Sequence, residues 1–368
     1  MAEPLLILAD DLTGAGDSAA RCRTAGLPAV VSLHPPPYDR QLAAGAVAFS
    51  SDSRHLPPAL AAERVGAVVR PYAAMRAHWY KKIDSTLRGN LGSEIDALLD
   101  TLGRSRMLIC PAFPAQQRTL HNGILLVGTT AFPERHLPTM LAHQSRRRVA
   151  HLPLQLVRSD NFAAALMAPD AELLVADALS DADLAGMVAA AAGQPALLLC
   201  GSAGLVSALA EQLVQSSAVP GGTWQIPAGP VLLAIGSGSS TAHRQLAYLA
   251  AARERHAILM HMPPPTPDIL LDSQQARMHA AAFAADVIAA IEQYQPACLV
   301  LSGGDTAQSV LARLGVVQLE ILAELLPGAP LARGRDAGGR MRYVVLKPGS
   351  QGNDDALLTI IRALRRIS

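Results

Sequence analysis

The feature that most constrains this chain is a repeated pattern: a short apolar run ends at a polar or glycine-rich turn, and a helical stretch follows. The runs occupy residues 5–9, 46–50, 79–83, 107–110, 196–200, 231–235, 298–301 and 343–346. Strands that alternate with helices at this spacing predict an α/β fold with mostly parallel sheets flanked by helices. Ligands of such folds bind beyond the carboxyl ends of the strands, where the polar turns of this chain fall.

A proline- and glycine-rich stretch divides the pattern in two. Residues 216–230 contain three prolines and three glycines, and the alternation of strands and helices resumes after them. A chain of 368 residues is also long for one domain. We therefore predict two domains, 1–218 and 231–368, joined by a linker at 219–230.

Composition argues against several classes of function. The chain has 31 basic and 30 acidic residues, so a net charge of +1 gives no overall field that favours nucleic acid or a membrane surface as a partner. No apolar run approaches the roughly 20 residues that span a bilayer. The four cysteines are far apart and form no C-x-x-C pair, which favours buried thiols in a reducing compartment. We expect a cytoplasmic protein.

Three turns rich in glycine and serine follow strands of the second domain, at residues 236–241, 302–306 and 349–352. Such turns at helix N-termini present backbone N–H groups that favour phosphate oxygens. One turn alone is more often simple backbone geometry, but three in one domain indicate a nucleotide or polyphosphate. The P-loop pattern is absent. The candidate nucleotide-binding residues are Ser237, Ser239, Gly303, Gly304, Asp305, Lys347, Gly349 and Gly352.

Charged side chains follow the strands of the first domain instead. The candidates are Asp10, Asp11, Arg54, Lys82, Asp84, Ser85 and Arg88. Some of the acids and hydroxyls could equally be helix caps. Strand alternation sends Lys81 and Lys82 to opposite faces, so one of the two can point into a shared pocket. Together these groups predict a small, polar pocket for a hydroxylated anion. No cluster has the spacing of a protein metal site, so we assign no metal ligands and expect Mg²⁺ to arrive with the nucleotide.

Motifs along nearly the whole chain also occur, in the same order, in a known family. They are ADDLTGA at 9–15, DSR at 52–54, KKIDSTLRGN at 81–90, PAFP at 111–114 and GSAGL at 201–205, followed by the three glycine turns. In these motifs the chain resembles the four-carbon acid sugar kinases, and KKIDSTLRGN is the most specific of them. The last motif departs from the family's usual K-x-G-G-F-G at Pro348 and Gln351, and Gly16 precedes Asp17 where asparagine is common. These departures leave the exact substrate and the nucleotide contacts open.

The resemblance implies ATP-dependent phosphorylation of the terminal hydroxyl of a four-carbon sugar acid such as D-threonate, D-erythronate or 3-oxo-tetronate. It implies that the N-terminal domain binds the acid and the C-terminal domain binds ATP. Our hypothesis is transfer in a cleft between the two domains. Arg54, Lys82 and Arg88 would hold the substrate. Asp11 or Asp84 would act as the catalytic carboxylate that orients the hydroxyl and accepts its proton.

Two other functions stay open at this point. The first is an NAD(P)-dependent acid sugar dehydrogenase, against which the incomplete dinucleotide pattern at 236–238 counts. The second is a regulator that binds a sugar acid without catalysis, although a regulator has no need of three phosphate-suited turns. The sequence does not set the oligomeric state, and a homo-oligomer is one option.

Overall fold

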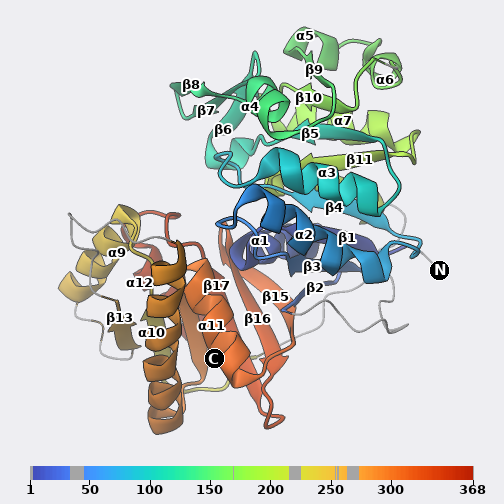
Figure 1. Cartoon of the computed structure of the whole chain (residues 1–368). Helices are drawn as coiled ribbons and strands as arrows, with labels where there is room; N and C mark the ends of the chain where they lie inside the picture. Colours follow the sequence, from blue (N-terminus) through green and yellow to red (C-terminus); the bar gives the residue numbers. More distant parts are fainter. Residues whose placement is uncertain are drawn as a thin grey trace. The chain divides into compact units, whose positions relative to one another are not determined.

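The computed structural model describes residues 3–33, 45–168, 170–214, 225–252, 254, 257–262 and 273–367. The chain forms two compact units (Figure 1). Unit 1 comprises Met1–Pro28 and Pro35–Val219, and unit 2 comprises Ala29–His34 and Pro220–Ser368. Residues 219–224 of the predicted linker lie outside the described residues.

Unit 1 is built on parallel strands in the order β3-β1-β4-β11-β5-β10-β9. They are β3 (Ala46–Ser50), β1 (Leu5–Ala9), β4 (His78–Lys82), β11 (Leu197–Gly201), β5 (Arg106–Cys110), β10 (Leu173–Ala176) and β9 (Val149–Leu152). Every residue of β1 is buried. Strands with helices on both sides have no solvent-facing side chains, which is why they appear in the sequence as continuous apolar runs.

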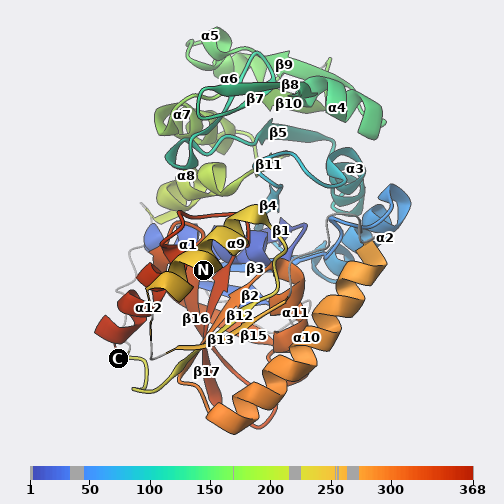
Figure 2. The same cartoon turned by 90° about the vertical axis from the view of Figure 1, so that its left-hand side faces the viewer.

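Helices cover both faces of these strands (Figure 2). One group is α1 (Leu12–Thr24), α7 (Asp181–Ala192) and α8 (Ala203–Val214), and the other is α2 (Pro58–Val69), α3 (Leu91–Thr101) and α4 (Leu137–Gln144). Their starts are encoded locally. Asp11 caps α1 by accepting a hydrogen bond from the Gly14 amide at 2.7 Å, and Ser180 and Asp183 form a capping box on α7.

Shorter elements complete unit 1. A separate antiparallel sheet, β6-β7-β8, joins the segment after β5 to α4. Its strands are β6 (Arg118–His121), β7 (Ile124–Val127) and β8 (Thr130–His136), and the short helices are α5 (Leu154–Val157) and α6 (Phe162–Ala165). This small sheet matters for function because Arg118, its first residue, lies beside the charged strand ends described below.

Unit 2 has a mixed sheet in the order β13-β12-β14-β17-β16-β15-β2. The strands are β13 (Ala257–His261), β12 (Val231–Ile235), β14 (Cys298–Ser302), β17 (Met341–Lys347), β16 (Ala329–Arg335), β15 (Gln318–Leu326) and β2 (Ala29–Ser32). The first four run parallel and the others pair antiparallel. The apolar pattern did not predict β13, β15, β16 or the transfer of β2 to unit 2. The two-residue turn at Pro327 and Gly328, where Gly328 has a φ of 78°, makes β15 and β16 a hairpin.

Helices lie on both sides of these strands as well (Figure 2). They are α9 (Ser240–Ala251) and α12 (Ala356–Arg366), which contact each other, and α10 (Ser273–Tyr294) and α11 (Gly304–Leu314), which also contact each other. The prediction of an α/β fold with mostly parallel strands flanked by helices is confirmed. Within the described part of the chain, no helix is both long and apolar enough to span a membrane.

Candidate active site

The charged residues predicted in the first half meet at one edge of the unit 1 sheet. The strands β3, β1 and β4 are neighbours, and Ala9 is in register with both Ser50 and Lys82. The residues that follow these three positions therefore share an edge. The Asn90 side-chain amide ties two of the loops together, because it donates to the carbonyl oxygens of Ser53 (3.1 Å) and Leu56 (2.8 Å).

Arg54 lies at the centre of this edge and contacts the acids that follow β1. Its Nε and Nη2 donate to the two carboxylate oxygens of Asp10 at 2.7 and 2.8 Å, and its Nη1 donates to Asp11 at 2.5 Å. Burial raises the pKa of Asp10, but the charge and hydrogen bonds of Arg54 outweigh it, and the net pKa is lowered. Asp10 is thereby fixed as a carboxylate, and Arg54 joins Asp10 and Asp11 through the paired hydrogen bonds that a guanidinium favours.

Asp84 is the third carboxylate of the cluster. Arg88 donates to both of its oxygens at 2.9 Å, the Thr86 amide donates at 3.1 Å, and Arg54 Nη2 lies 3.9 Å away. Burial opposes ionisation of Asp84, yet the hydrogen bonds of Arg88 and the charge of Arg54 hold its pKa far below the usual range. Asp84 is therefore an ionised acceptor at neutral pH and not a group poised to exchange protons there.

The loop that carries Asp84 adopts a backbone that few sequences tolerate. Leu87 has a φ of 64° and Gly89 a φ of 96°. A Cβ at Gly89 would lie 3.3 Å from Asp10 Oδ2. Asp52, in the neighbouring loop before Arg54, also has a positive φ, 49°. Strained residues gather at binding sites that need a fixed geometry.

The two adjacent lysines of β4 have separate surroundings. Lys81 is fully buried and pairs with Glu94 of α3, its Nζ 2.8 Å from the carboxylate. Lys82 donates to the Ile83 carbonyl at 3.0 Å, and its Nζ lies 3.3 Å from a Cβ built on Gly14 of α1. Lys82 therefore lies beside the start of α1, and Lys81 joins β4 to α3, while the charges of both lysines lower the pKa of Asp10.

Two residues of this cluster did not appear among the sequence candidates. Asp17 of α1 is buried, its Oδ1 has no hydrogen-bond partner, and burial raises its pKa against the opposing charges of Lys82 and Arg21. Arg118 donates to the Ser85 hydroxyl, and burial lowers its pKa. Asp17 lies two residues after the first motif, in the helix that this motif opens and four residues after Thr13, which was a usable signal. Arg118 reaches the site through the β6-β7-β8 fold, which the sequence pattern does not reveal.

In unit 2 the three predicted glycine turns also come together. They follow β12, β14 and β17, which are neighbours, with Ser302 in register with Ile235 and Lys347. The Ser239 hydroxyl caps α9 and donates to the Gly349 carbonyl at 2.8 Å, which joins the first turn to the third. The Gly303 amide donates to the Lys347 carbonyl at 3.0 Å. Gly304 and Asp305 open α11 at the middle turn.

The packing of these turns has the form of a phosphate cradle. A Cβ on Gly349 would lie 1.9 Å from Ser237 Oγ, and a Cβ on Gly236 would lie 1.9 Å from Thr306 Oγ1. Glycine is therefore required at both positions. The buried Ser302 hydroxyl, at the centre of the three turns, has no hydrogen-bond partner. Small residues and an unpaired hydroxyl, beside the N-termini of α9 and α11, suit the oxygens of a polyphosphate.

Lys347 supplies a cation beneath the third turn. Its Nζ donates to the carbonyls of Pro348 at 3.0 Å and Gln351 at 2.9 Å, and burial lowers its pKa to about 8. Gln245 of α9 fixes the same turn, because its side-chain amide donates to the carbonyls of Gln351, Gly352 and Asn353 at 2.9–3.1 Å. These contacts use main-chain carbonyls and so do not depend on the side chains of Pro348 and Gln351, and the buried side-chain oxygen of Gln351 has no hydrogen-bond partner.

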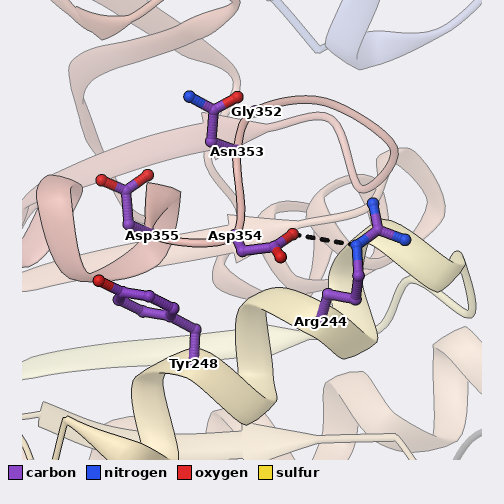
Figure 3. Close-up of a pocket in the computed structure, with 6 residues that line it drawn as sticks. All are labelled: Arg244, Tyr248, Gly352, Asn353, Asp354 and Asp355. Carbon is purple, nitrogen blue, oxygen red and sulfur yellow. Dashed lines mark hydrogen bonds and ion pairs between the residues drawn. The ribbon is translucent and has the colours of Figure 1, made fainter.

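A cavity of about 470 Å³ adjoins the third turn (Figure 3). Two of its lining residues, Arg244 and Tyr248, project from α9, and the others are the consecutive residues Gly352, Asn353, Asp354 and Asp355. Arg244 and Asp354 form an ion pair at 3.0 Å. Among the residues that the structure describes, no group of three or more His, Cys, Asp or Glu side chains is arranged to hold a metal ion.

Comparison with known proteins places both sites in a family. Residues 5–209, more than half of the chain, match the model of a sugar-binding N-terminal domain, and residues 271–357 match that of a nucleotide-binding C-terminal domain. The charged cluster of unit 1 lies in the first match. The second and third glycine turns lie in the other.

Relatives of similar length share the whole chain. A D-threonate kinase of Bordetella bronchiseptica is 32% identical, over 98% of this chain and 97% of the relative. A 3-oxo-tetronate kinase of Burkholderia multivorans is 30% identical, again over 98% and 97%. Identity at this level over full length shows common descent of both domains together.

Solved structures agree on the fold. A Salmonella typhimurium LT2 protein, described as a tRNA synthase, has a TM-score of 0.79 at 22% identity, covering 99% of this chain and all of that one. A Bordetella bronchiseptica domain of unknown function, crystallised with bound citrate as a domain-swapped dimer, has a TM-score of 0.51 at 28% identity, covering 99% of both chains.

The fold and the two sites define an α/β protein with a sugar-binding and a nucleotide-binding domain. The chain belongs to the four-carbon acid sugar kinase family.

Proposed function

We propose that this chain is a kinase that transfers the γ-phosphate of ATP to the terminal, 4-hydroxyl of a four-carbon sugar acid. D-Threonate is the first candidate, and D-erythronate and 3-oxo-tetronate are the alternatives. The observation that carries the proposal is the pair of sites: a buried cluster of arginines, lysine and carboxylates in the unit that matches a sugar-binding domain, and a glycine–serine cradle in the unit that matches a nucleotide-binding domain. The names of the full-length relatives support the substrate class.

The unit 1 cluster suits a hydroxylated carboxylate. Arg88, whose side chain is 52% exposed, and Lys82 offer cationic donors for the carboxylate, and Arg54 fixes the acids between them. Asp10, Asp11 and Ser85 present oxygen atoms for the sugar hydroxyls. We propose that these side chains set the position of the acid, so that one terminal hydroxyl faces the carboxylates.

The unit 2 cradle suits a triphosphate. Its candidate contacts are Ser237, Ser239, Gly303, Gly304, Asp305, Lys347, Gly349 and Gly352. Two features support phosphate binding here. The Ser302 hydroxyl has no hydrogen-bond partner, and the turns hold glycines at positions where a Cβ would clash with a neighbouring side chain. Mg²⁺ bound with the nucleotide would supply positive charge that offsets charge developing on the phosphates.

Asp11 and Asp84 are the two candidates for the catalytic carboxylate. Phosphoryl transfer has a loose transition state, so the main task of this group is to orient the hydroxyl, and the proton leaves late. Asp84, held ionised by Arg88, can accept the hydrogen bond of the hydroxyl at neutral pH. Positioning by Arg54, Lys82 and Arg88 and charge stabilisation by Lys347 and the backbone amides would account for most of the rate enhancement.

A coupled ADP-release assay with Mg-ATP and a panel of four- to six-carbon sugar acids tests the proposal. We expect turnover with one four-carbon acid. Asp84→Asn should then lower kcat at least a hundredfold, since it removes an ionised acceptor at the reacting hydroxyl, and Ser237→Ala should mainly raise the KM for ATP. Asp160→Asn, at an exposed position of unit 1, is the control and should behave as the parent.

The outcomes separate the rival functions. Turnover with longer acids alone would keep the kinase and remove the four-carbon substrate. Binding of an acid and of ATP without any ADP release would favour the regulator. Full activity of Asp84→Asn would remove Asp84 as the catalytic carboxylate and leave Asp11.

Three expectations stay predictions. They are an active site in a cleft between the two domains, a cytoplasmic location, and a homo-oligomeric state. The last is supported by the Bordetella bronchiseptica protein that crystallised as a domain-swapped dimer.

A further inference from the structure

The cavity beside the third glycine turn has a lining unlike that of the phosphate cradle. It carries the carboxylates of Asp354 and Asp355, the Arg244 guanidinium and the phenol ring of Tyr248. With two carboxylates and one guanidinium, the lining has a net negative charge, which disfavours the binding of a triphosphate here. The same groups favour a ligand that is neutral, aromatic and rich in hydroxyl donors.

The position of the cavity continues the cradle along the chain. Gly352 lines the cavity and also belongs to the turn that Gly349 begins, and Gln245 holds the carbonyls of Gln351, Gly352 and Asn353 in one rigid arc. A ligand whose phosphates lie on the turns at Ser237 and Gly349 can therefore reach the cavity along this segment of chain. The cavity is open to solvent, since all six lining residues are exposed, and its volume of about 470 Å³ leaves room for a small molecule.

The ring of Tyr248 provides the surface that such a ligand needs. Tyr248 is 47% exposed, and it faces the loop that carries Asp354 and Asp355 (Figure 3). An exposed aromatic ring beside hydrogen-bond acceptors is a stacking platform for a base. Asp355 stands at the N-terminus of α12, where its side chain makes no capping hydrogen bond and accepts one from the Thr359 hydroxyl at 3.4 Å, so its other oxygen is available to a ligand.

We propose that this cavity is the nucleoside subsite, in which Tyr248 stacks on the base and Asp355 accepts hydrogen bonds from the ribose hydroxyls. The proposal rests on the proposed function, because it requires that a nucleoside triphosphate is the phosphate donor. In this proposal, α9 and the segment before α12 bind the nucleoside, and the glycine turns bind the phosphates.

The test compares binding of Mg-ATP with binding of Mg-tripolyphosphate, which has the phosphates but no nucleoside. We expect Tyr248→Ala to weaken ATP about tenfold and to change the affinity for tripolyphosphate less than twofold. Tyr248→Phe keeps the ring and should recover most of the ATP affinity that Tyr248→Ala loses. Tyr294→Ala is the matched control, since Tyr294 of α10 is 46% exposed and lies outside the cavity.

The ribose contact has its own readout. The parent should bind ATP more tightly than 2′-deoxy-ATP, and Asp355→Ala should reduce that preference severalfold, because the acceptor for the hydroxyl is gone. Melting temperatures of all variants, measured without ligand, verify that they fold.

Each remaining result counts against the subsite. If Tyr248→Ala binds ATP as the parent does, or weakens ATP and tripolyphosphate equally, Tyr248 does not recognise the base. If Asp355→Ala leaves the preference for ATP over 2′-deoxy-ATP unchanged, the ribose is bound elsewhere. Binding of neither ATP nor tripolyphosphate by the parent would instead remove the proposed kinase function, and the subsite with it.

Discussion

Lysine is rare in this chain, and each of its three copies is buried at the end of a strand. Lys81, Lys82 and Lys347 are 0%, 4% and 2% exposed, and the other basic residues are arginines. Lys81 has a carboxylate partner in Glu94. Lys347 instead donates to two main-chain carbonyls, and its burial lowers its pKa. A buried amine whose partners are neutral carbonyls has no opposite charge beside it, so it favours the binding of an anion.

This arrangement makes the charge of Lys347 sensitive to pH. Its pKa of about 8 lies below the 10.5 of a free lysine, so between these values the unfolded chain binds more protons than the folded one. The stability that this group contributes is therefore complete above pH 10.5 and is lost as the pH falls through 8. Phosphates beside the amine would reverse the shift by favouring its charged form.

We predict that Lys347 titrates near pH 8 in the free protein and that its pKa rises by about one unit or more when Mg-ADP binds. Three lysines make the measurement direct, because ¹³C-labelled lysine side chains give few NMR signals and Lys347→Arg assigns one of them. Lys81, already paired with Glu94, serves as the internal control. A Lys347 midpoint that does not move at saturating Mg-ADP would show that the amine does not meet the phosphates.

At the scale of elements, the contact between the turns after β12 and β17 should contribute to stability as well as to binding. Gly349 packs so closely on Ser237 that a methyl group would overlap both Oγ (1.9 Å) and Cβ (2.1 Å). We predict that Gly349→Ala lowers the free energy of unfolding by about 1–3 kcal/mol, because the two turns must separate. Thermal melting without nucleotide measures the effect.

A second substitution distinguishes this contact from a general effect of replacing glycine. Ser237→Gly removes both overlapping atoms and should restore most of the stability lost in Gly349→Ala. Gly338→Ala is the control, since a Cβ there meets a single atom, Asp336 Oδ1, at an ordinary 3.4 Å. Equal melting temperatures for Gly349→Ala and Gly338→Ala would mean that the turns do not need this close approach.

The sequence predicted the parallel strands better than the other elements. The expected strands 5–9 and 231–235 coincide with β1 and β12, since a buried parallel strand is a continuous apolar run with polar residues at both ends. The same rule located the Asp10–Asp11 turn and the three glycine turns. Strand β15 escaped prediction because Glu320 and Glu324 interrupt its apolar residues, so it is not a continuous apolar run. Arg118 and Tyr248 escaped because their positions depend on how a hairpin and a helix pack, which local patterns do not encode.

At the scale of the whole molecule, the chain order does not follow the division into units. Strand β2 lies early in the sequence, yet it belongs to unit 2, where Val31 pairs with Leu319 of β15. Val47 of β3, only 16 residues later, belongs to unit 1 and pairs with Leu6 of β1. Both valines are buried. Equivalent substitutions at these neighbouring positions should therefore weaken different units.

We predict that Val31→Ala speeds amide hydrogen exchange about tenfold or more in β15 and β16, and that Val47→Ala does so in β1 and β4. Each substitution removes two buried methyl groups, a loss of about 2 kcal/mol, and exchange reports the stability of the cooperative unit that contains the amide. Peptide-resolved mass spectrometry of both variants under the same conditions makes each the control for the other. If Val31→Ala acted on β1 and β4 as strongly as on β15, β2 would not depend on unit 2 for its stability, and the early segment of the chain would fold with the rest of unit 1.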